Sequence, residues 1–337
     1  MKATTLNQLA FRLGEYFTDH LPRVRGVSAH TIHSYRDSWV LFLRFLASQR
    51  NGRVHDLDLG DIEPDQVIAF LAHLEAVRKN GVTTRNVRLA AIHAFFRYVG
   101  AYHPEQLNRV HRILSIPFKR ARQRVIEYLE RDEIEAVLSG INRAGGDGRR
   151  DYALLATMFN TGARVQEIVD LRARDLQLIR PFQIRLFGKG RKERFCPLWS
   201  QTAQVLRDHC EECHLDLRSD ARVFLNYRGY PLTRFGVRYI LAKHLNHART
   251  DMKTLKRKRL HPHSMRHSTA VALLTSGVDL TTISQWLGHS SPNTTNIYAT
   301  IDLAMKRRAI TQVKPVAQRA DSSWRRNKSV LEWLESL

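Results

Sequence analysis

The chain has 337 residues, and 43% of them are apolar, which is enough to form two packed domains. It carries 54 Lys and Arg against 32 Asp and Glu, and this formal net charge of +22 indicates a polyanionic partner such as nucleic acid. No apolar run reaches the ~18 residues of a membrane span, and the N-terminus lacks the apolar block of a signal peptide, so we expect a cytoplasmic protein that does not contact membranes.

Residues 1–114 have the pattern of a small domain of four helices. Apolar side chains recur in this region with the three-four spacing of a buried helix face, and Ser28 stands where the second helix would need an N-cap. The polar faces of these helices carry basic residues such as Arg85 and Arg88. The predicted helices lie over about 4–21, 28–47, 63–81 and 83–100.

A basic segment follows over 115–126, where a proline interrupts the helical pattern. This composition favours an extended interdomain linker, and a solvated surface strand is the alternative. The linker is favoured because a well-formed helix begins directly afterwards, at about residue 130. The basic side chains of the segment are Lys119, Arg120, Arg122 and Arg124.

Residues 127–314 combine helices with a β-hairpin and predict an α+β domain that is mainly α with a small β-sheet. The hairpin is predicted from PFQIRLFGKGRKERFCPL, residues 181–198, in which a Gly-Lys-Gly turn around Lys189 separates two strands. A tail over 315–337 ends in a short apolar helix. The other predicted helices lie over about 130–141, 150–161, 164–170, 200–212, 233–247, 263–276, 280–287 and 302–313.

The cysteines, Cys196, Cys210 and Cys213, are too few and too uneven in number for a disulfide framework. The C-x-x-C pair at 210–213 lacks the second pair of ligands that a structural zinc site of this type needs. We therefore expect no bound metal ion and no cofactor.

The segment HPHSMRHSTA, residues 261–270, could be a metal site, a phosphate-binding site or the start of a helix rich in histidine. If a helix starts here, His263 and Arg266 lie on one face about one turn apart. Zinc binding by His263 and His267 would need a glutamate after the first histidine, where Ser264 stands instead. An arginine beside the pair would also repel a metal ion, so the segment suits a phosphate better.

Other candidate side chains lie before and after this segment. Arg164 stands in the first turn of a predicted helix with Glu167 one turn later, a spacing that alone indicates an ordinary surface ion pair. Lys189 occupies the hairpin turn and offers a point charge. His289 follows a Leu-Gly turn, and Tyr298 comes nine residues later.

Taken together, two arginines, a lysine on a β-hairpin, the H-x-x-R pair, the histidine of LGHSS and the tyrosine of NIYATI resemble the tyrosine recombinase, or phage integrase, family. The likeness is to Xer-like and transposon-borne integrases in particular, and it spans about 126–310 with every motif in order. It implies a helical, SAM-like core-binding domain over 1–114, a linker over 115–126 and a catalytic domain over 127–314, which would close on DNA as a C-shaped clamp.

The resemblance implies a site-specific DNA recombinase that cuts and rejoins strands through a 3′-phosphotyrosine intermediate, without metal or ATP, by way of a Holliday junction. Tyr298 would be the nucleophile, which conserves the phosphodiester energy in a covalent bond. Arg164 and Arg266 would bind the charge that develops on the phosphate in the transition state, and His289 would donate a further hydrogen bond.

The remaining roles concern protons. His263 would be the base that helps the phenol lose its proton, and Lys189 would protonate the leaving 5′ oxygen. Glu167 would orient the site without reacting. His261 and His267 are expected to be structural or to face DNA, outside the catalytic set.

The implied partners are double-stranded DNA with inverted-repeat core sites and further copies of the chain, as a tetramer on paired sites, with or without other recombinases. Basic side chains are expected to bind the DNA backbone. The expected DNA-binding residues are Arg85, Arg88, Lys119, Arg120, Arg122, Arg124, Arg191, Lys192, Lys253, Lys256, Arg257, Lys258 and Arg259.

Two alternatives stay open at the level of sequence. One is an accessory protein that binds DNA without cutting it, against which the intact set of six catalytic positions argues. The other is a type IB topoisomerase, which shares the chemistry but relaxes supercoils. The separate N-terminal helical domain and the C-terminal tail favour recombination.

The tail ends in NKSVLEWLESL, residues 327–337, where Ser329 and Glu332 have the spacing of a capping box. A helix this short is unstable alone in water, so its apolar side chains are expected to dock on a protein surface. That surface could belong to its own domain or to a neighbouring protomer, in which case the tail is swapped.

Overall fold

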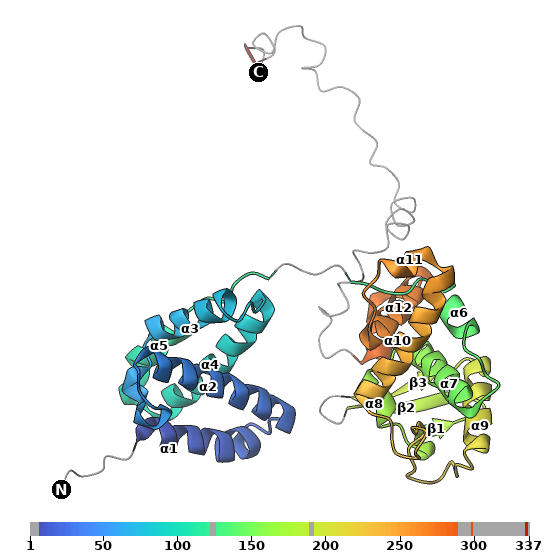
Figure 1. Ribbon diagram of the computed structural model, residues 1–337, viewed down its shortest axis with the longest axis horizontal. Coiled ribbons are helices and arrows are strands. Elements are labelled where there is room, and N and C mark those ends of the chain that lie inside the picture. Colours follow the sequence, from blue (N-terminus) through green and yellow to red (C-terminus); the bar gives the residue numbers. More distant parts are fainter. Residues whose placement is uncertain (1–6, 122–125, 189–191, 289–297, 299–333, 336–337) are drawn as a thin grey trace. The chain divides into compact units, whose positions relative to one another are not determined.

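The computed structural model describes residues 7–121, 126–188, 192–288, 298 and 334–335. The chain divides into two compact units, residues 1–124 and 125–337, and Figure 1 draws the elements of each. The predicted helix over 302–313 and nearly all of the predicted tail lie outside the described residues. In the described part of the chain, no helix is both long enough and apolar enough to cross a membrane.

The first unit is a group of helices around an aromatic core. Ser28 accepts a hydrogen bond from the backbone N–H of Thr31, which confirms it as the N-cap of the second helix. Trp39 packs on Phe95 with ring centroids 4.6 Å apart, so the apolar faces predicted for these helices meet in the core. The helices are α1 (Gln8–Glu15), which continues as a wider helical turn over Tyr16–Val24, α2 (Ala29–Gln49), α3 (Pro64–Ala76), α4 (Val82–Tyr102) and α5 (Leu107–Leu114).

The described start of the basic segment, residues 115–121, packs against the first unit. Ile116 is buried in the core of that unit. The backbone N–H of Lys119 donates to the side-chain carbonyl of Asn86, and the amide of Asn86 donates to the carbonyl of Lys119. The packing of the first unit therefore extends at least to Lys119, past the point where the sequence pattern places the start of a linker.

The second unit contains a three-stranded antiparallel sheet in the order β1-β2-β3. The predicted hairpin is formed by β2 (Gln183–Phe187) and β3 (Glu193–Pro197), with Ile184 opposite Cys196 and both side chains buried. The additional strand β1 (Leu176–Gln177) pairs with β2, and its two residues are too few to show an alternating pattern in the sequence.

Helices make up the rest of the second unit, so the prediction of a mainly α fold with a small sheet is confirmed. α12 packs against α7, α10 and α13 and so brings distant parts of the chain together. Its first residue is Pro262, whose fixed φ and missing N–H suit that position. The helices are α6 (Arg131–Ser139), α7 (Gly146–Thr161), α8 (Val165–Val169), α9 (Ser200–Glu212), α10 (Arg234–Asp251), α11 (Lys253–Lys256), α12 (Pro262–Thr275) and α13 (Leu280–Leu287).

Candidate active site

The junction of α7 and α8 places Arg164. α7 ends at Gly162, whose φ of +59° is a left-handed conformation that glycine adopts without strain and that turns the chain toward α8. Arg164 then caps α8: its backbone N–H donates to Oε2 of Glu167 at 2.8 Å, and its Nη1 donates to Oε1 at 2.8 Å. The Glu167 side chain is only 3% exposed, so this pair is a buried capping interaction and not an ordinary surface contact.

Arg266 points from α12 into the interior of the second unit and is 1% exposed. Its Nη1 donates to the carbonyl of Gly162 at 2.7 Å, and its Nη2 donates to the carbonyl of Leu287 at 2.6 Å. Burial and the charge of Arg164 lower the pKa of Arg266 to about 10, so the group stays protonated at neutral pH. Because both partners are neutral carbonyls, they orient the guanidinium without cancelling its charge.

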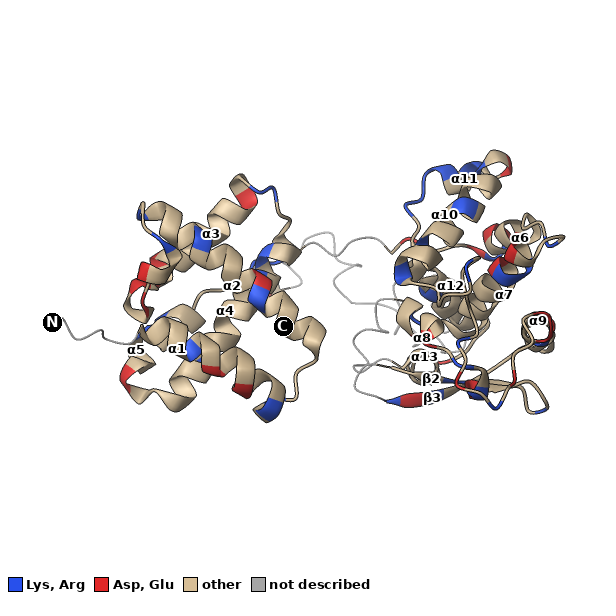
Figure 2. Ribbon diagram, turned by 60° about the horizontal axis from the view of Figure 1, so that its bottom comes forward, with Lys and Arg blue, Asp and Glu red and all other residues tan. Residues whose placement is uncertain are grey.

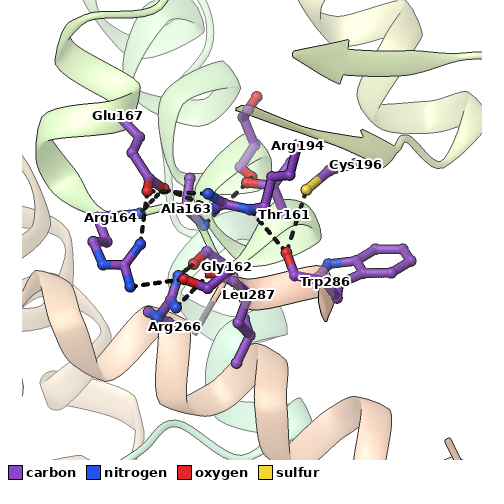
Figure 3. Close-up of polar contacts among 12 residues, drawn as sticks. Thr161, Gly162, Ala163, Arg164, Glu167, Arg194, Cys196, Arg266, Trp286 and Leu287 are labelled. Carbon is purple, nitrogen blue, oxygen red and sulfur yellow. Dashed lines mark hydrogen bonds and ion pairs between the residues drawn. The ribbon is translucent and has the colours of Figure 1, made fainter. Parts of the chain in front are cut away.

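Arg194 of β3 also joins the site, and the sequence analysis missed it. Its Nη1 and Nη2 donate to the two carboxylate oxygens of Glu167 at 3.0 and 2.7 Å, and its Nε donates to the carbonyl of Trp286 at 2.9 Å (Figure 3). Arg194 lies in phase with the buried Cys196 along β3. This alternation is the one signal in the sequence that could have shown an arginine facing inward.

Glu167 stays ionised at the centre of this group. Burial alone would raise the pKa of Glu167, but hydrogen bonds and charge from Arg194 and then Arg164 outweigh it, so the net effect lowers the pKa. A carboxylate that is buried and charged in this way needs both arginines as partners.

Tyr298 lies against α12 and is 1% exposed, in an apolar cluster that includes Leu287. Its hydroxyl oxygen is 2.7 Å from Nδ1 of His267, a residue that the sequence analysis left outside the catalytic set. Burial raises the pKa of Tyr298 to about 12, and the charge of Arg266 offsets part of that rise. The phenol is therefore protonated at neutral pH, and a reaction at its oxygen requires a group that takes the proton.

His263 stands in the first turn of α12, with part of its side chain exposed. The rings of His263 and His267 meet edge to face with centroids 4.6 Å apart. Loss of surrounding water and the charge of Arg266 lower the pKa of His263 to about 4, so its ring is neutral at pH 7.

The structure thus brings Arg164, Glu167, His263 and Arg266 into one region of the second unit with Tyr298. Each of these groups contacts another member of the site, or has a pKa that the charge of another member changes. The predicted site residues outside the described part of the chain are Arg122, Arg124, Lys189, Arg191 and His289.

The predicted DNA-binding residues of the first unit make contacts inside that unit. Arg85 is 6% exposed and donates to the carbonyl of Pro117, because the basic segment covers the face of α4 that carries it. Arg88 donates to the hydroxyl of Ser38 at 2.9 Å. Lys119 donates to Glu75 at 2.6 Å, whereas Arg120 is exposed. Arg85 is therefore a structural residue in this unit, contrary to the expectation that it lies on a polar helix face.

The predicted basic residues around α11 present more of their charge to solvent, and Figure 2 draws them in blue. Lys258 is an exception, because its Nζ donates to Glu133 at 2.6 Å. A cavity of about 660 Å³ lies beside this segment. Its lining includes Arg238, Arg249, Lys256, Arg257, Arg259 and His261. Lys192, at the hairpin, and Lys253, at the start of α11, are exposed.

Comparison with known proteins gives matches to both units. Residues 127–305 match the phage integrase family, and residues 15–101 match the N-terminal SAM-like domain of phage integrases. The protein y4rC of Sinorhizobium fredii, named as an integrase/recombinase, is 38% identical over 330 residues, which are 98% of this chain and 98% of y4rC. The tyrosine recombinase XerD of Listeria innocua is 32% identical over 280 residues, 81% of this chain and 89% of XerD.

Solved structures share the fold at lower identity. The XerH site-specific recombinase bound to palindromic difH superposes with a TM-score of 0.66 at 23% identity, covering 85% of this chain and 81% of XerH. The Tn1549 transposon integrase in complex with circular intermediate DNA gives a TM-score of 0.66 at 17% identity, covering 89% of this chain and 98% of that chain.

A helical N-terminal unit followed by an arginine-lined site beside a buried tyrosine defines the class, that of the tyrosine site-specific recombinases. Within it, the family match over 127–305 and the identity to y4rC show that the chain belongs to the phage integrase family.

Proposed function

We propose that this recombinase cuts and rejoins DNA through a 3′-phosphotyrosine bond at Tyr298. The observation that carries the proposal is the placement of the phenol against α12, the helix that also supplies Arg266 and His263. The phenol thus contacts the helix that carries the proposed charge-stabilising arginine and the proposed base. Attack by the phenol oxygen on phosphorus would break the bond to the 5′ oxygen and conserve its energy for rejoining, so ATP is not required, and the arginines would supply the positive charge that a metal ion supplies in other nucleases.

Arg164 and Arg266 would stabilise the negative charge that builds up on the nonbridging oxygens. Their side chains are held in advance by the carbonyls of Gly162, Leu287 and Gly288, so little reorganisation is needed when the phosphate arrives. Glu167 would orient Arg164 without reacting. We assign a further donor role to His289 at the same phosphate.

Proton transfers complete the reaction. His263, neutral at pH 7, would accept the phenol proton directly or through the adjacent ring of His267. Lys189 would give a proton to the 5′ oxygen, which leaves poorly as an alkoxide. After strand exchange the same groups work in reverse, and two successive exchanges pass through a Holliday junction.

The substrate would be double-stranded DNA with inverted-repeat core sites, bound in the cytoplasm by a tetramer of this chain on paired sites. The lambda integrase is known as a dimer bound to a COC′ core site, and the Tn1549 integrase with circular intermediate DNA. These likenesses and the charge of +22 support DNA as the partner. The proposed linker over 115–126 and the predicted basic residues of the second unit would bind the DNA backbone.

The tail over 315–337 would dock on a neighbouring protomer in this assembly. The second unit has an apolar cavity of about 540 Å³ between α6, α7, α9 and α12, and it is a suitable size for the Trp333 and Leu334 side chains of a short helix. Its apolar lining includes Leu138, Phe159, Trp199, Val205 and Leu273.

A nicked suicide substrate tests the proposed function, because cleavage beside the nick releases a short strand and traps the covalent intermediate. Tyr298→Phe should bind DNA as the wild type does and form no adduct. Tyr230→Phe, a change in the same unit at a tyrosine that is exposed and outside the site, is the matched control and should form the adduct normally. An adduct formed by Tyr298→Phe would exclude Tyr298 as the nucleophile.

A further inference from the structure

Three consecutive backbone carbonyls at the end of α13 each accept a hydrogen bond from a different arginine. Arg194 donates to Trp286 at 2.9 Å, Arg266 donates to Leu287 at 2.6 Å, and Arg164 donates to Gly288 at 3.1 Å. The arginines come from β3, α12 and the start of α8. The C-terminal end of a helix carries partial negative charge, which favours cations at this position.

Of these three arginines, Arg194 is the one whose side chain connects the end of α13 to Glu167. Its side chain is 10% exposed, and its three nitrogens serve Trp286 and both carboxylate oxygens. The fit is close, because a Cβ at Gly288 would lie 3.1 Å from the Arg194 side chain. Glycine at 288 thus leaves room for Arg194 while it offers its own carbonyl to Arg164.

The charges explain why a second arginine at Glu167 matters. With Arg194 present, two guanidinium groups share the Glu167 carboxylate and Arg266 donates to neutral carbonyls, so positive charge is left over for a phosphate. Without Arg194, the buried Glu167 carboxylate would keep Arg164 as its remaining cationic partner. It would then neutralise more of the positive charge of Arg164. The end of α13 would also lose one of its three attachments.

We propose that Arg194 is a positioning residue for DNA cleavage: it holds Glu167 and the end of α13, so that Arg164 and Arg266 keep their geometry and their charge for the scissile phosphate. This inference rests on the proposed function. Arg194 does not itself touch the reacting atoms, and it acts through Glu167 and the carbonyl of Trp286.

The first measurement compares single-turnover adduct formation at saturating DNA with DNA affinity. Arg194→Met should slow adduct formation by roughly 10- to 100-fold, the scale of a small misplacement of catalytic groups, and should leave the Kd within about threefold. Arg185→Met is the matched control, because Arg185 on the neighbouring strand β2 pairs with Asp175, whose side chain is 2% exposed, away from the site. It should lose stability and keep the wild-type rate per folded molecule.

The second measurement is a rescue. In Arg194→Met/Glu167→Gln, the neutral amide still caps α8 but no longer captures Arg164, so adduct formation should recover relative to Arg194→Met. Arg194→Lys keeps the positive charge and loses the planar set of N–H donors that binds both carboxylate oxygens. It should cleave DNA more slowly than the wild type, and it provides the test if Arg194→Met folds poorly.

The results that would overturn this inference differ from those that would overturn the proposed function. Full cleavage by Arg194→Met and Arg194→Lys, in a preparation whose wild type forms the adduct and whose Tyr298→Phe variant does not, would overturn this inference alone. Equal losses of rate in Arg194→Met and in the double variant would overturn the claim that Arg194 preserves the charge of Arg164, because Arg164 would then gain nothing from the removal of the carboxylate. A wild type that forms no adduct would overturn the proposed function and this inference together.

Discussion

Replacing Gly162 with alanine tests the turn that places both arginines of the proposed phosphate site. Gly162 has a φ of +59°, and a Cβ there would overlap Cδ2 of Leu287 and lie 3.3 Å from Thr269. The left-handed conformation costs a residue with a Cβ about 1–2 kcal/mol. The crowding at Leu287 adds about 1–3 kcal/mol, as expected for overpacking in a core.

We therefore expect Gly162→Ala to lower the free energy of unfolding by about 2–5 kcal/mol, measured by urea denaturation followed by circular dichroism. Gly229→Ala is the control, because Gly229 has a φ of +78° and no atom within 4 Å of the added Cβ. It should lose only the conformational cost of about 1–2 kcal/mol.

The rate of DNA cleavage should also distinguish Gly162→Ala from Gly229→Ala. The carbonyls of Gly162 and Leu287 both hold Arg266, so a shift of Leu287 should slow adduct formation per folded Gly162→Ala molecule. Gly229→Ala should keep the wild-type rate. Equal losses of stability in both variants would mean that Leu287 moves aside without cost and that the packing argument is wrong.

Four further predictions follow from the site and the charge of the chain. Arg164→Ala and Arg266→Ala should each slow adduct formation by about 100-fold or more, while a binding assay shows little change in Kd. His267→Asn, which keeps a hydrogen-bonding group near the phenol, should form the adduct faster than His267→Phe in the same suicide-substrate assay. A plot of log Kd against log salt should be steep, with a magnitude of about 5 or more if six phosphates are contacted, and a flat plot would argue against backbone binding. Deletion of 327–337 should leave binding to a single site intact and impair synapsis in a gel assay with paired sites, whereas unchanged synapsis would leave only docking on its own domain.

The sequence predicted the elements whose cause is local. The apolar spacing and Ser28 predicted α2, and the H-x-x-R pattern predicted that His263 and Arg266 share a helix. Both depend on residues within a few turns of one another. The contacts between these helices and other parts of the chain depend on how the helices pack, which the local pattern does not specify.

The sequence could not predict contacts that depend on distant backbone. Arg194 meets a carbonyl 92 residues away, and a carbonyl is present in every residue, so it leaves no mark in the sequence. The contact of His267 with Tyr298 was not predicted for a related reason: spacing does not tell which of several neighbouring histidines the fold turns toward Tyr298. Arg85 is buried because a segment about 30 residues later folds over it, which helical periodicity alone does not reveal.

The row of carbonyls at the end of α13 makes the site depend on the length of this helix more than on the side chains at its exposed positions. A carbonyl is present whatever side chain its residue carries, so residue 286, which is only partly buried, can vary in type and still bind Arg194, whereas Leu287 is also fixed by its buried side chain. One inserted or deleted residue within α13, in contrast, would rotate the helix end by about 100° relative to its start and misalign all three carbonyls at once. A mutant library of this helix should therefore keep the number of residues from 280 to 288 fixed, keep Ile283, Leu287 and Gly288, and vary the exposed positions Thr281, Thr282 and Gln285.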